Sequence, residues 1–469
     1  MKKSTIEIKQ VTRIEGHASV KIDINQNKEV ISAKLIVKEL RGFEKILEKM
    51  KVVEMPMVTA RICGVCPAAH HIVSAKALDR AFGVKPAEAG KMIRELMYMG
   101  HIIHSHTMSL FFLSGPDLIM GIDSDPSKRN IIGMSKVYPD IVKQAIELRS
   151  MGQKFLEQLG ARGVHPVTAT AGGVSFSLKD SLRSKLLKDA AKMLKLATSF
   201  ALPIIKKKLD DFINDYPELV NQMEVKTHYM GTVNNGYLNF YDGLIRVMDP
   251  QGNIENEFNS EDYANYISEK AVDWCYLKPT YLETSNGETT YSSNPLSRIN
   301  VAEKMETQLA NEELKIFRKK YGRPCHLSLM QHYARLIEIV YACEKSILLL
   351  NNEEIMGDPR TPINQAAKSA IAHIEAPRGI LFHDYVVDDN DLIKNINFII
   401  ATQQNFLAIN ETIEQCASYF LKHSISSLRN AIEFSIRTFD PCLSCSTHAF
   451  GSSYLPIDIY EHNKKIMEI

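Results

Sequence analysis

Hydrophobic positions change their spacing several times along the chain, and each change predicts a different kind of element. Residues 4–40 alternate between apolar and polar side chains, as in STIEIKQV and HASVKIDINQNKEVISAKLIVKEL, which is the period of strands with one buried face. The dipeptide Gln26-Asn27 lies where two of these strands would turn back on each other. We therefore expect a small antiparallel sheet at the N-terminus.

Helical spacing of apolar residues governs most of the remaining chain. It begins with RGFEKILEKM, runs through 88–113, 138–160 and 179–216 with an interruption near Pro203, and returns at 300–352 and 407–436. Turn-forming stretches such as DPQGN and SNGETTYSSN lie between 220 and 300. The sequence thus predicts an α+β fold that is predominantly α. It would have a long-helix bundle core over 41–220 and 300–448, the N-terminal sheet over about 1–40, and a mixed insertion over 220–300.

The composition is that of a folded protein with a large core. Of the 469 residues, 45% are hydrophobic, and the formal net charge of +1 offers no overall field for nucleic acid or an anionic membrane surface. No run approaches the roughly 18 consecutive apolar residues of a membrane span, and the first residues lack the apolar stretch of a signal peptide. We therefore expect a cytoplasmic protein, and the lack of a flexible linker predicts one compact unit over residues 1–448.

Four of the eight cysteines form two Cys-x-x-Cys pairs near opposite ends of the chain. RICGVC contains Cys63 and Cys66, and DPCLSC contains Cys442 and Cys445, with about 375 residues between the pairs. That separation differs from the close spacing of zinc-finger ligands, and neither pair lies in the βαβ unit of a thioredoxin-type protein. In a reducing cytosol the pairs favour a soft metal such as nickel, iron or zinc over disulfides, and a structural four-thiolate zinc scaffold stays an open alternative. The other four cysteines are isolated and are expected to be buried thiols: Cys275, Cys325, Cys343 and Cys416.

Six stretches follow one another in an order that resembles the large subunit of nickel–iron hydrogenases. They are VTRIEGH (11–17), RGFE (41–44), RICGVCPAAHH (61–71), HPVTATAGGV (165–174), APRG (376–379) and DPCLSCSTH (440–448). The resemblance runs almost from end to end, and it implies a catalytic subunit that cleaves and forms H2 heterolytically. A related quinone-reductase branch that includes a subunit of respiratory complex I is another alternative, but that branch lacks the four cysteines.

The resemblance implies a set of metal ligands. Cys63 and Cys442 would bind nickel alone, whereas Cys66 and Cys445 would bridge nickel and iron. The iron would carry carbon monoxide and two cyanide ligands, which maturation enzymes supply. Pro67 stands where the family often has Thr, and position 442 is Cys rather than selenocysteine.

The resemblance also assigns residues around the metals. Pro377 and Arg378 of APRG would form part of the pocket for the iron ligands, with the guanidinium as a hydrogen-bond donor and a fixed positive charge. Asp117 and Asp440 would flank this arginine, because a buried guanidinium without a carboxylate partner is costly.

Two further side chains would handle protons and orient a ligand. Glu15 would shuttle protons beside a terminal nickel cysteine, as a partly buried carboxylate can, with an ion pair to Arg13 as the structural alternative. His70 would orient a bridging thiolate by hydrogen bonding. The remaining histidines of this region are expected to be ordinary core or surface residues: His71, His101, His104 and His106.

A second buried metal site is also implied by the resemblance. Glu44 and His448 match its ligands, the backbone carbonyl of Phe398 would add an oxygen, and the ion would be magnesium or iron. In most of the family a dedicated protease cuts just after this histidine once nickel is in place. We therefore expect the 21 residues of the extension 449–469 to be removed during maturation.

The cysteine count and the resemblance together imply partner proteins. Once the four paired cysteines are assigned, no iron–sulfur motif remains, so electrons would leave through further electron-transfer chains, the first of them an iron–sulfur small subunit. A maturation protease and nickel-insertion proteins would act on the chain. The stretches CYLKPTYL (275–282) and NPLSRIN (294–300) look like the cytosolic groups. Among these groups, the resemblance favours the methyl-viologen-reducing type that feeds heterodisulfide reductase over the nicotinamide- and deazaflavin-linked types.

Overall fold

The N-terminal residues form the antiparallel sheet that the sequence predicts. Its strands β1 (Ser4–Ile8), β2 (Ser19–Ile24) and β3 (Val30–Ile36) pair in the order β1-β2-β3. The turn falls at Gln26-Asn27, where the side-chain oxygen of Asn25 accepts the N–H of Asn27 at 2.9 Å. The inner face of the sheet packs on helix α15 (Phe406–His423).

The computed structural model describes residues 4–39, 42–447, 458–461 and 464–468. The predictions for His448 and for cleavage of the tail therefore lie outside the described residues. The last described segments, β17 (Asp458–Glu461) and β18 (Lys464–Glu468), form a short antiparallel pair.

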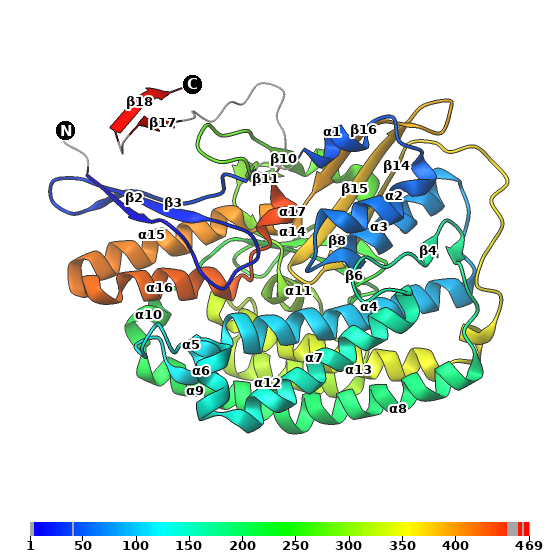
Figure 1. Ribbon diagram of the computed structural model, residues 1–469, viewed down its shortest axis with the longest axis horizontal. Coiled ribbons are helices and arrows are strands. Elements are labelled where there is room, and N and C mark those ends of the chain that lie inside the picture. Colours follow the sequence, from blue (N-terminus) through cyan, green and yellow to red (C-terminus); the bar gives the residue numbers. More distant parts are fainter. Residues whose placement is uncertain (1–3, 40–41, 448–457, 462–463, 469) are drawn as a thin grey trace.

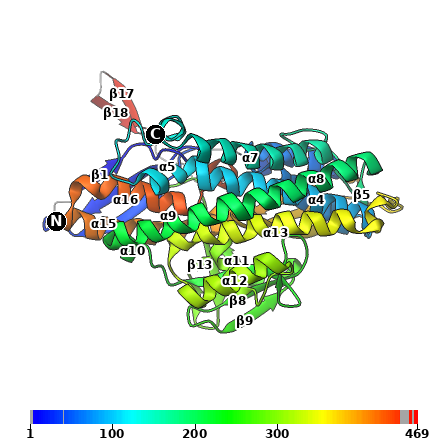
Figure 2. The same cartoon turned by 90° about the horizontal axis from the view of Figure 1, so that it is seen from below.

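Long helices form the bundle that the helical spacing predicts. Helices α4 (Glu88–Met108), α7 (Pro139–Gly160), α8 (Asp180–Leu196) and α13 (Gln331–Asn351) lie side by side in Figures 1 and 2. The interruption near Pro203 is a π turn at Ala197–Ala201, after which the helix continues as α9 (Leu202–Asp215). The helix widens before the proline because the proline has no N–H to donate. The helix does not break at this point.

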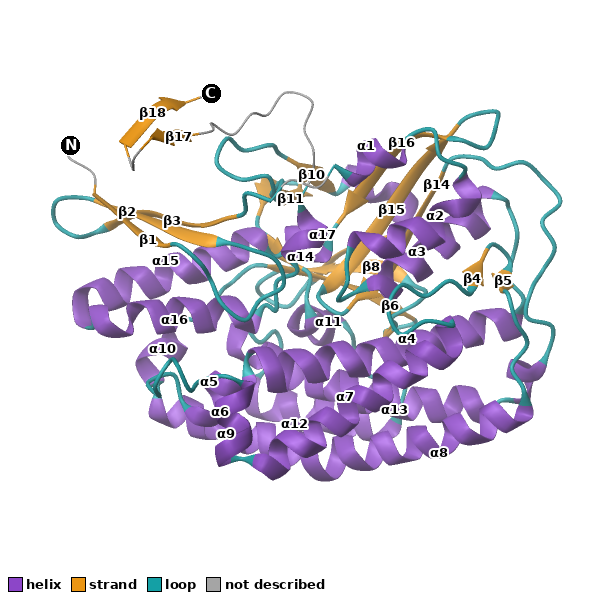
Figure 3. Ribbon diagram, in the orientation of Figure 1, coloured by secondary structure: helices purple, strands orange, loops and turns teal. Residues whose placement is uncertain are grey.

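A three-stranded sheet lies where the sequence analysis assigned only helical core within 300–448. Strands β14 (Ala370–Ala376), β15 (Gly379–Val387) and β16 (Ile393–Ile399) pair antiparallel in that order (Figure 3). Helix α3 (Pro67–Ala81) packs on this sheet, and strand β6 (His228–Asn234) also contacts it. Residues 372–383 are buried without alternation, so the period of a half-exposed strand is missing from the sequence.

The predicted mixed insertion is built from short strands. One sheet has the order β13-β6-β8-β9, with β13 (Tyr291–Ser292), β8 (Leu244–Met248) and β9 (Ile254–Phe258), and a second contains β10 (Ile267–Glu269), β11 (Thr280–Thr284) and β12 (Gly287–Thr289). Figure 2 shows this region projecting from one side of the helices. Its small core includes Met230 and Val247 together with Ile380 and Phe382 of β15, so the insertion packs on the central sheet.

Shorter elements complete the described chain. The remaining α-helices are α1 (Phe43–Leu47), α2 (Met55–Thr59), α5 (Gly115–Met120), α6 (Ile131–Val137), α10 (Pro217–Asn221), α11 (Pro295–Val301), α12 (Gln308–Tyr321), α14 (Ala401–Gln404), α16 (Ile425–Thr438) and α17 (Leu443–Ser446). The others are the 3-10 helices Val52–Glu54, Ala60–Ile62, Ser260–Asn265, Ser328–Met330 and Glu353–Met356, the π turn Ser109–Leu113, and the strands β4 (Ala169–Thr170), β5 (Gly173–Val174) and β7 (Tyr237–Leu238). Within the described ranges, no helix has the length and apolar character to cross a bilayer.

Candidate metal centre

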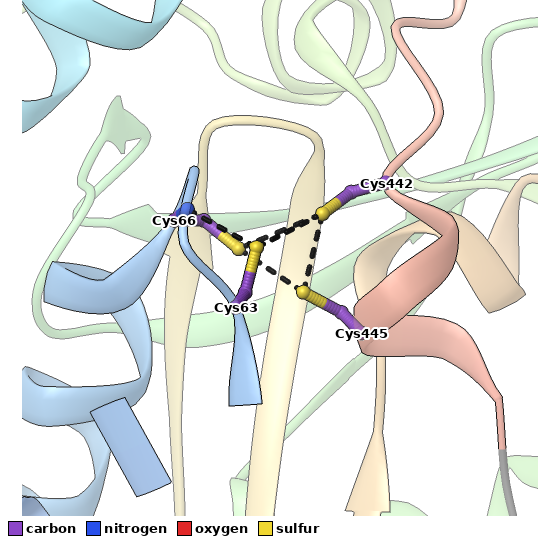
Figure 4. Close-up of side chains that lie close together, drawn as sticks. All are labelled: Cys63, Cys66, Cys442 and Cys445. Carbon is purple, nitrogen blue, oxygen red and sulfur yellow. Dashed lines mark hydrogen bonds between the residues drawn. The ribbon is translucent and has the colours of Figure 1, made fainter. Parts of the chain in front are cut away.

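The four paired cysteines converge on one point. Their sulfur atoms all lie within 4.8 Å of one another, all four side chains are buried, and all four are free thiols. Figure 4 shows the sulfurs pointing toward one another from the two ends of the chain. The Sγ–Sγ distance is 3.2 Å for Cys66–Cys445, 3.3 Å for Cys63–Cys442 and 3.8 Å for Cys66–Cys442. Four thiolates on one ion lie roughly 3.8 Å apart, because each metal–sulfur bond is about 2.3 Å, so the set has the size of a metal site.

The first pair is placed by a bend and a helix start. Cys63 follows the 3-10 helix Ala60–Ile62 in an extended conformation, and Cys66 is the N-cap of α3. The sulfur of Cys63 accepts the backbone N–H groups of Val65 and Cys66, each at 3.3 Å. Pro67 occupies the first helical position, where a missing N–H has no cost, so the departure from Thr is compatible with the start of α3.

The second pair is held beside the N-terminal segment. Cys442 precedes α17, and the backbone of Glu15 pairs with Cys442 in a parallel bridge. The N–H of Leu443 donates to the carbonyl of Glu15 at 3.1 Å, and the N–H of Ser444 donates to its carboxylate Oε2 at 3.0 Å. Gly16 permits this approach, because it has a φ of +81° and an added Cβ would lie 2.9 Å from Leu443 Cβ. The structure therefore places the half-buried carboxylate of Glu15 next to the helix that carries the second pair.

Arg378 occupies the tip of a tight hairpin. Ala376 ends β14 and pairs with Gly379 at the start of β15, so Pro377 and Arg378 form a two-residue loop. The Nε of Arg378 donates to the carbonyl of Asp440 at 2.6 Å, and Nη2 lies 3.0 Å from Oδ2 of the same residue as an ion pair. Burial lowers the pKa of Arg378, but Asp440 and the neighbouring cysteine thiolates outweigh burial and raise it, so the guanidinium is charged.

A small pocket adjoins three of the four sulfurs. It is lined by Cys66, Cys442 and Cys445 together with Pro377, Arg378 and Thr402, among others. Nη1 of Arg378 is buried and donates no hydrogen bond to any described residue. A buried donor beside soft thiolates fits an iron ion that carries small anionic ligands. The residues present therefore fit a nickel–iron group.

Charge is unevenly shared among the cysteines. Hydrogen bonds from the other three cysteines hold the pKa of Cys63 well below its usual range, and this makes Cys63 the thiol that ionises first. His70 lies in the same pocket, and burial lowers the pKa of its imidazole to about 4. His70 is therefore neutral, and its Nδ1 lies 3.1 Å from Nε2 of His383.

Asp117 has different partners from the one predicted. Its carboxylate pairs with Arg13 at 2.6 Å, with Arg129 at 3.0 Å and with Arg437 at 2.9 Å. The structure records an ion pair to Arg378 from Asp440 and none from Asp117. Three arginines from distant segments surround Asp117, and their charges satisfy it without the arginine of the hairpin. The structure thus corrects the expectation that Asp117 flanks Arg378.

The parts of the second predicted metal site that the structure describes lie on packed elements. Glu44 is in the first turn of α1, which packs against β16, the strand that contains Phe398. The ring of Phe398 is 4.5 Å from that of His383 between centroids. The third predicted ligand, His448, lies outside the described residues.

Several residues near the site were not singled out from the sequence. The hydroxyl of Thr402 accepts the N–H of Cys442 at 2.9 Å, and Nδ1 of His383 lies 2.7 Å from the hydroxyl of Tyr385. The stretch IIATQQN after β16 shows a polar cluster in an apolar context, which is the pattern that could have indicated Thr402. His106 was expected to be ordinary, but its Nε2 lies 2.7 Å from the buried carboxylate of Glu338.

His71 and the four isolated cysteines have the structural roles expected of them. His71 bonds through Nδ1 to the carbonyl of Pro56 at 2.8 Å and through Nε2 to the N–H of Ala169 at 2.9 Å, as a structural histidine does. Burial raises the pKa of the Cys275 and Cys325 thiols to about 11, so both are neutral. The four isolated cysteines are buried and free: Cys275, Cys325, Cys343 and Cys416.

The sequence is similar to those of proteins whose family is known. The family model of the nickel-dependent hydrogenases matches residues 41–132 and 290–448, and a HoxL-like model matches residues 5–40. One relative is a subunit of the F420-non-reducing hydrogenase vhu of Methanocaldococcus jannaschii. It is 39% identical over 419 residues, which cover 89% of this chain and 99% of that protein. The beta subunit of the NAD-reducing hydrogenase HoxS of Cupriavidus necator is 32% identical over 478 residues, or 98% of each chain.

A solved structure extends the likeness to three dimensions. The chain superposes on the crystal structure of an NAD+-reducing NiFe-hydrogenase in the H2-reduced state with a TM-score of 0.90 at 32% identity, over 95% of this chain and 99% of that one. These matches do not favour a zinc scaffold or a nickel-free quinone reductase. The family model covers more than half of the chain, and with these relatives it shows that the chain belongs to the nickel-dependent hydrogenases, as their catalytic large subunit.

Proposed function

We propose that the four cysteines hold nickel and iron as the resemblance implies, with Cys63 and Cys442 on nickel alone and Cys66 and Cys445 bridging. The convergence of four buried sulfurs beside a charged arginine carries this proposal. When bound, the metal group would supply soft electrophilic sites that take the electron pair of H2 while a proton leaves. The protein then has to hold the group, keep water away and move the proton.

Arg378 holds the negative side of the group. The iron would carry carbon monoxide and two cyanides, and the unpartnered Nη1 of Arg378 in the pocket suits a cyanide nitrogen as acceptor. Pro377 and the apolar side chains around it exclude water from the same pocket. Asp440 anchors the guanidinium through its carbonyl and its carboxylate, and so keeps Arg378 aimed at the metals.

Glu15 takes the proton that leaves the metals. Its carboxylate accepts only one hydrogen bond from the described backbone, that of Ser444, so one oxygen stays available for a proton. Asp117 supports this segment, because Arg13 and Arg437 both bind Asp117 and Arg437 also donates from Nε to the carbonyl of Thr12 at 2.8 Å. We assign Asp117 to positioning Glu15 in place of its predicted role beside Arg378.

His70 orients the bridging sulfur of Cys66. Both residues line the pocket, and the bond between His70 Nδ1 and His383 Nε2 fixes the plane of the His70 ring. Because both imidazoles are buried and neutral, the contact is a directional hydrogen bond and carries no charge.

A second cation joins the central sheet to the C-terminal end of the described chain. Glu44 would supply a carboxylate oxygen, Phe398 its backbone carbonyl and His448 an imidazole, with magnesium or iron as the ion. The packing of α1 on β16 supports the pairing of Glu44 with Phe398. Removal of residues 449–469 by a maturation protease would leave His448 as the C-terminus beside this ion.

Other proteins carry the electrons. We propose further electron-transfer subunits as partners together with an iron–sulfur small subunit, and nickel-insertion proteins during maturation. The two relatives described above are themselves named as subunits of hydrogenases. The higher identity to the F420-non-reducing relative than to the NAD-reducing one supports the branch that feeds heterodisulfide reductase.

The experiment that tests this function removes one bridging sulfur. In Cys445→Ser a hydroxyl replaces a soft ligand, so H2-dependent reduction of an artificial electron acceptor should fall at least about 100-fold, together with nickel content. The matched control is Cys416→Ser, which changes a buried free thiol away from the quartet and should leave turnover unchanged. Full nickel and normal turnover in Cys445→Ser would contradict the assignment.

A further inference from the structure

A fully buried arginine contacts the turn that carries Arg378. Arg298 of α11 is 0% exposed. It donates from Nη1 to the carbonyl of Ala376 at 2.9 Å and from Nη2 to the carbonyl of Pro377 at 3.0 Å. These two carbonyls immediately precede Arg378 in the hairpin loop, so the backbone position of Arg378 depends on the guanidinium of Arg298.

Every N–H group of Arg298 is engaged. Nε and Nη2 donate to the two carboxylate oxygens of Glu338, each at 2.7 Å, and Nη1 donates to Glu375 at 3.0 Å. With the two turn carbonyls this makes five hydrogen bonds for the five N–H donors of a guanidinium. A guanidinium that is bound at all five of its donors is held in one orientation. The ammonium group of a lysine cannot reproduce this planar set of hydrogen bonds.

Glu338 is itself fixed and charged. It lies on α13 and is bonded by His106 of α4 at 2.7 Å, and Arg298, Glu338 and His106 are all 0% exposed. Burial raises the pKa of the Glu338 carboxyl, but Arg298 and His106 outweigh burial and lower it to about 2. The support for the turn thus extends into two of the long helices of the bundle.

A second side chain holds the turn at its next carbonyl. Nδ2 of the buried Asn405 donates to the carbonyl of Arg378 at 3.0 Å and to that of Ser293 at 2.7 Å. The side-chain oxygen of Asn405 accepts the N–H of Ser293 at 3.0 Å. All three consecutive carbonyls, at 376, 377 and 378, are therefore bound by buried side chains.

Stability alone does not account for this arrangement. Burying Arg298 with two glutamates costs several kcal/mol of desolvation per ion, and apolar side chains of equal volume commonly serve stability as well. Burial outweighs the pairing at Glu375, whose pKa is raised. What the apolar alternative lacks is a directional hold on two carbonyls of the turn.

We propose that Arg298 is a positioning residue for H2 turnover. By holding the carbonyls of Ala376 and Pro377, it sets where the guanidinium of Arg378 lies relative to the cysteine sulfurs. The inference rests on the proposed role of Arg378. A displacement of about 1 Å at a reacting centre lowers turnover on the order of 100-fold, so loss of the hold is measurable.

A double-mutant cycle on the holoenzyme tests the proposal. The variants are Arg298→Lys, Arg378→Lys and the pair, with kcat for H2 oxidation measured per bound nickel. We expect Arg298→Lys to lower kcat at least about tenfold at unchanged nickel and iron content. If Arg298 acts through Arg378, the double variant should match Arg378→Lys within about twofold, because the two changes remove one function.

The matched control is another fully buried arginine. Arg94 is also 0% exposed, binds Asp79 at 2.6 Å and donates to the carbonyl of Gly173 at 3.0 Å, away from the hairpin turn. Arg94→Lys should lower the melting temperature as Arg298→Lys does, yet leave kcat per nickel unchanged. This separates loss of a buried ion pair from loss of the turn.

The proposal is overturned if Arg298→Lys keeps wild-type kcat per nickel, or if the losses of the two single variants multiply in the pair. If Arg298→Lys does not yield holoenzyme, Asn405→Asp takes its place in the cycle with the same expectations, because it removes the donors to the carbonyl of Arg378 at equal volume. If Arg378→Lys itself leaves turnover unchanged, the role of Arg378 and this inference both fall. If Arg378→Lys is impaired and the cycle is additive, the inference alone falls.

Discussion

The carboxylate of Glu15 lies where the N-terminal segment meets the helix of the second cysteine pair. Its backbone pairs with Cys442, and its side chain accepts the N–H of Ser444 at 3.0 Å. Arg13, two residues earlier, is held by Asp117. We propose that this half-buried carboxylate takes up a proton at the metal site and releases it by a small rotation.

Glu15→Gln tests this role at the scale of one atom. The amide of Gln keeps the shape of the side chain and an oxygen that accepts from Ser444. It cannot take up a proton at neutral pH. H2 oxidation should fall about 100-fold or more, because the general base is lost. Conversion between ortho- and para-hydrogen should persist, since it requires only the metals.

The control for Glu15→Gln is Glu29→Gln in the exposed turn after β2. That carboxylate also accepts a hydrogen bond, from Asn25 at 2.7 Å, but it is exposed in the connection between β2 and β3. The Glu29→Gln variant should oxidise H2 at the wild-type rate. Near-normal H2 oxidation by Glu15→Gln would place the proton path elsewhere.

Single residues with a distinctive neighbourhood in the sequence could be predicted, and their partners could not. The paired motifs indicated the four cysteines, whose sulfurs do converge, and the resemblance placed Asp440 beside Arg378, with which it forms an ion pair. Asp117 was assigned the wrong arginine, because GPDL shows a buried acid but does not show which of many arginines folds against it.

At the scale of elements, the β14–β15 hairpin carries Arg378 to the sulfurs. Gly379 closes its two-residue loop with a φ of +137°, which side chains rarely adopt. A Cβ at this position would lie 1.9 Å from the carbonyl oxygen of Ser293. The hairpin can therefore approach the insertion only with glycine here.

Gly379→Ala should consequently destabilise the protein. The strained backbone alone costs ~1–3 kcal/mol, and the contact with the Ser293 carbonyl adds to this, so thermal unfolding should begin at a clearly lower temperature. Gly163→Ala is the control, because its Cβ would meet no atom closer than the flexible end of Gln153 at 3.1 Å. Equal melting temperatures for the two variants would contradict this account of the turn.

Some helices and strands could be predicted from the sequence, and others could not. Helices such as α7 and α8 and the N-terminal sheet were predicted because one of their faces is exposed, so that apolar and polar residues alternate with the period of the element. The β14–β16 sheet was missed because α3 and the insertion bury β14 and β15 on both sides. Because both faces of this sheet are packed, the sheet holds the hairpin that carries Arg378 in place.

At the scale of the whole molecule, distant parts of the chain meet at one site. Glu15 comes from the N-terminal region and Arg378 from the hairpin of the central sheet. Cys63 and Cys66 come from the start of α3, and Cys442 and Cys445 from the start of the last described helix, as Figure 4 shows. The site therefore depends on contacts between segments that are far apart in the sequence. A metal bound to the four cysteines would therefore show that these segments have come together.

We propose that these cysteines hold nickel and iron with small diatomic ligands. Infrared spectroscopy of the purified holoenzyme, with elemental analysis of the same sample, can detect this group. We predict bands of metal-bound carbon monoxide and cyanide together with nickel and at least an equal amount of iron. A sample that contains zinc alone, or one that oxidises H2 without such bands, would contradict the account.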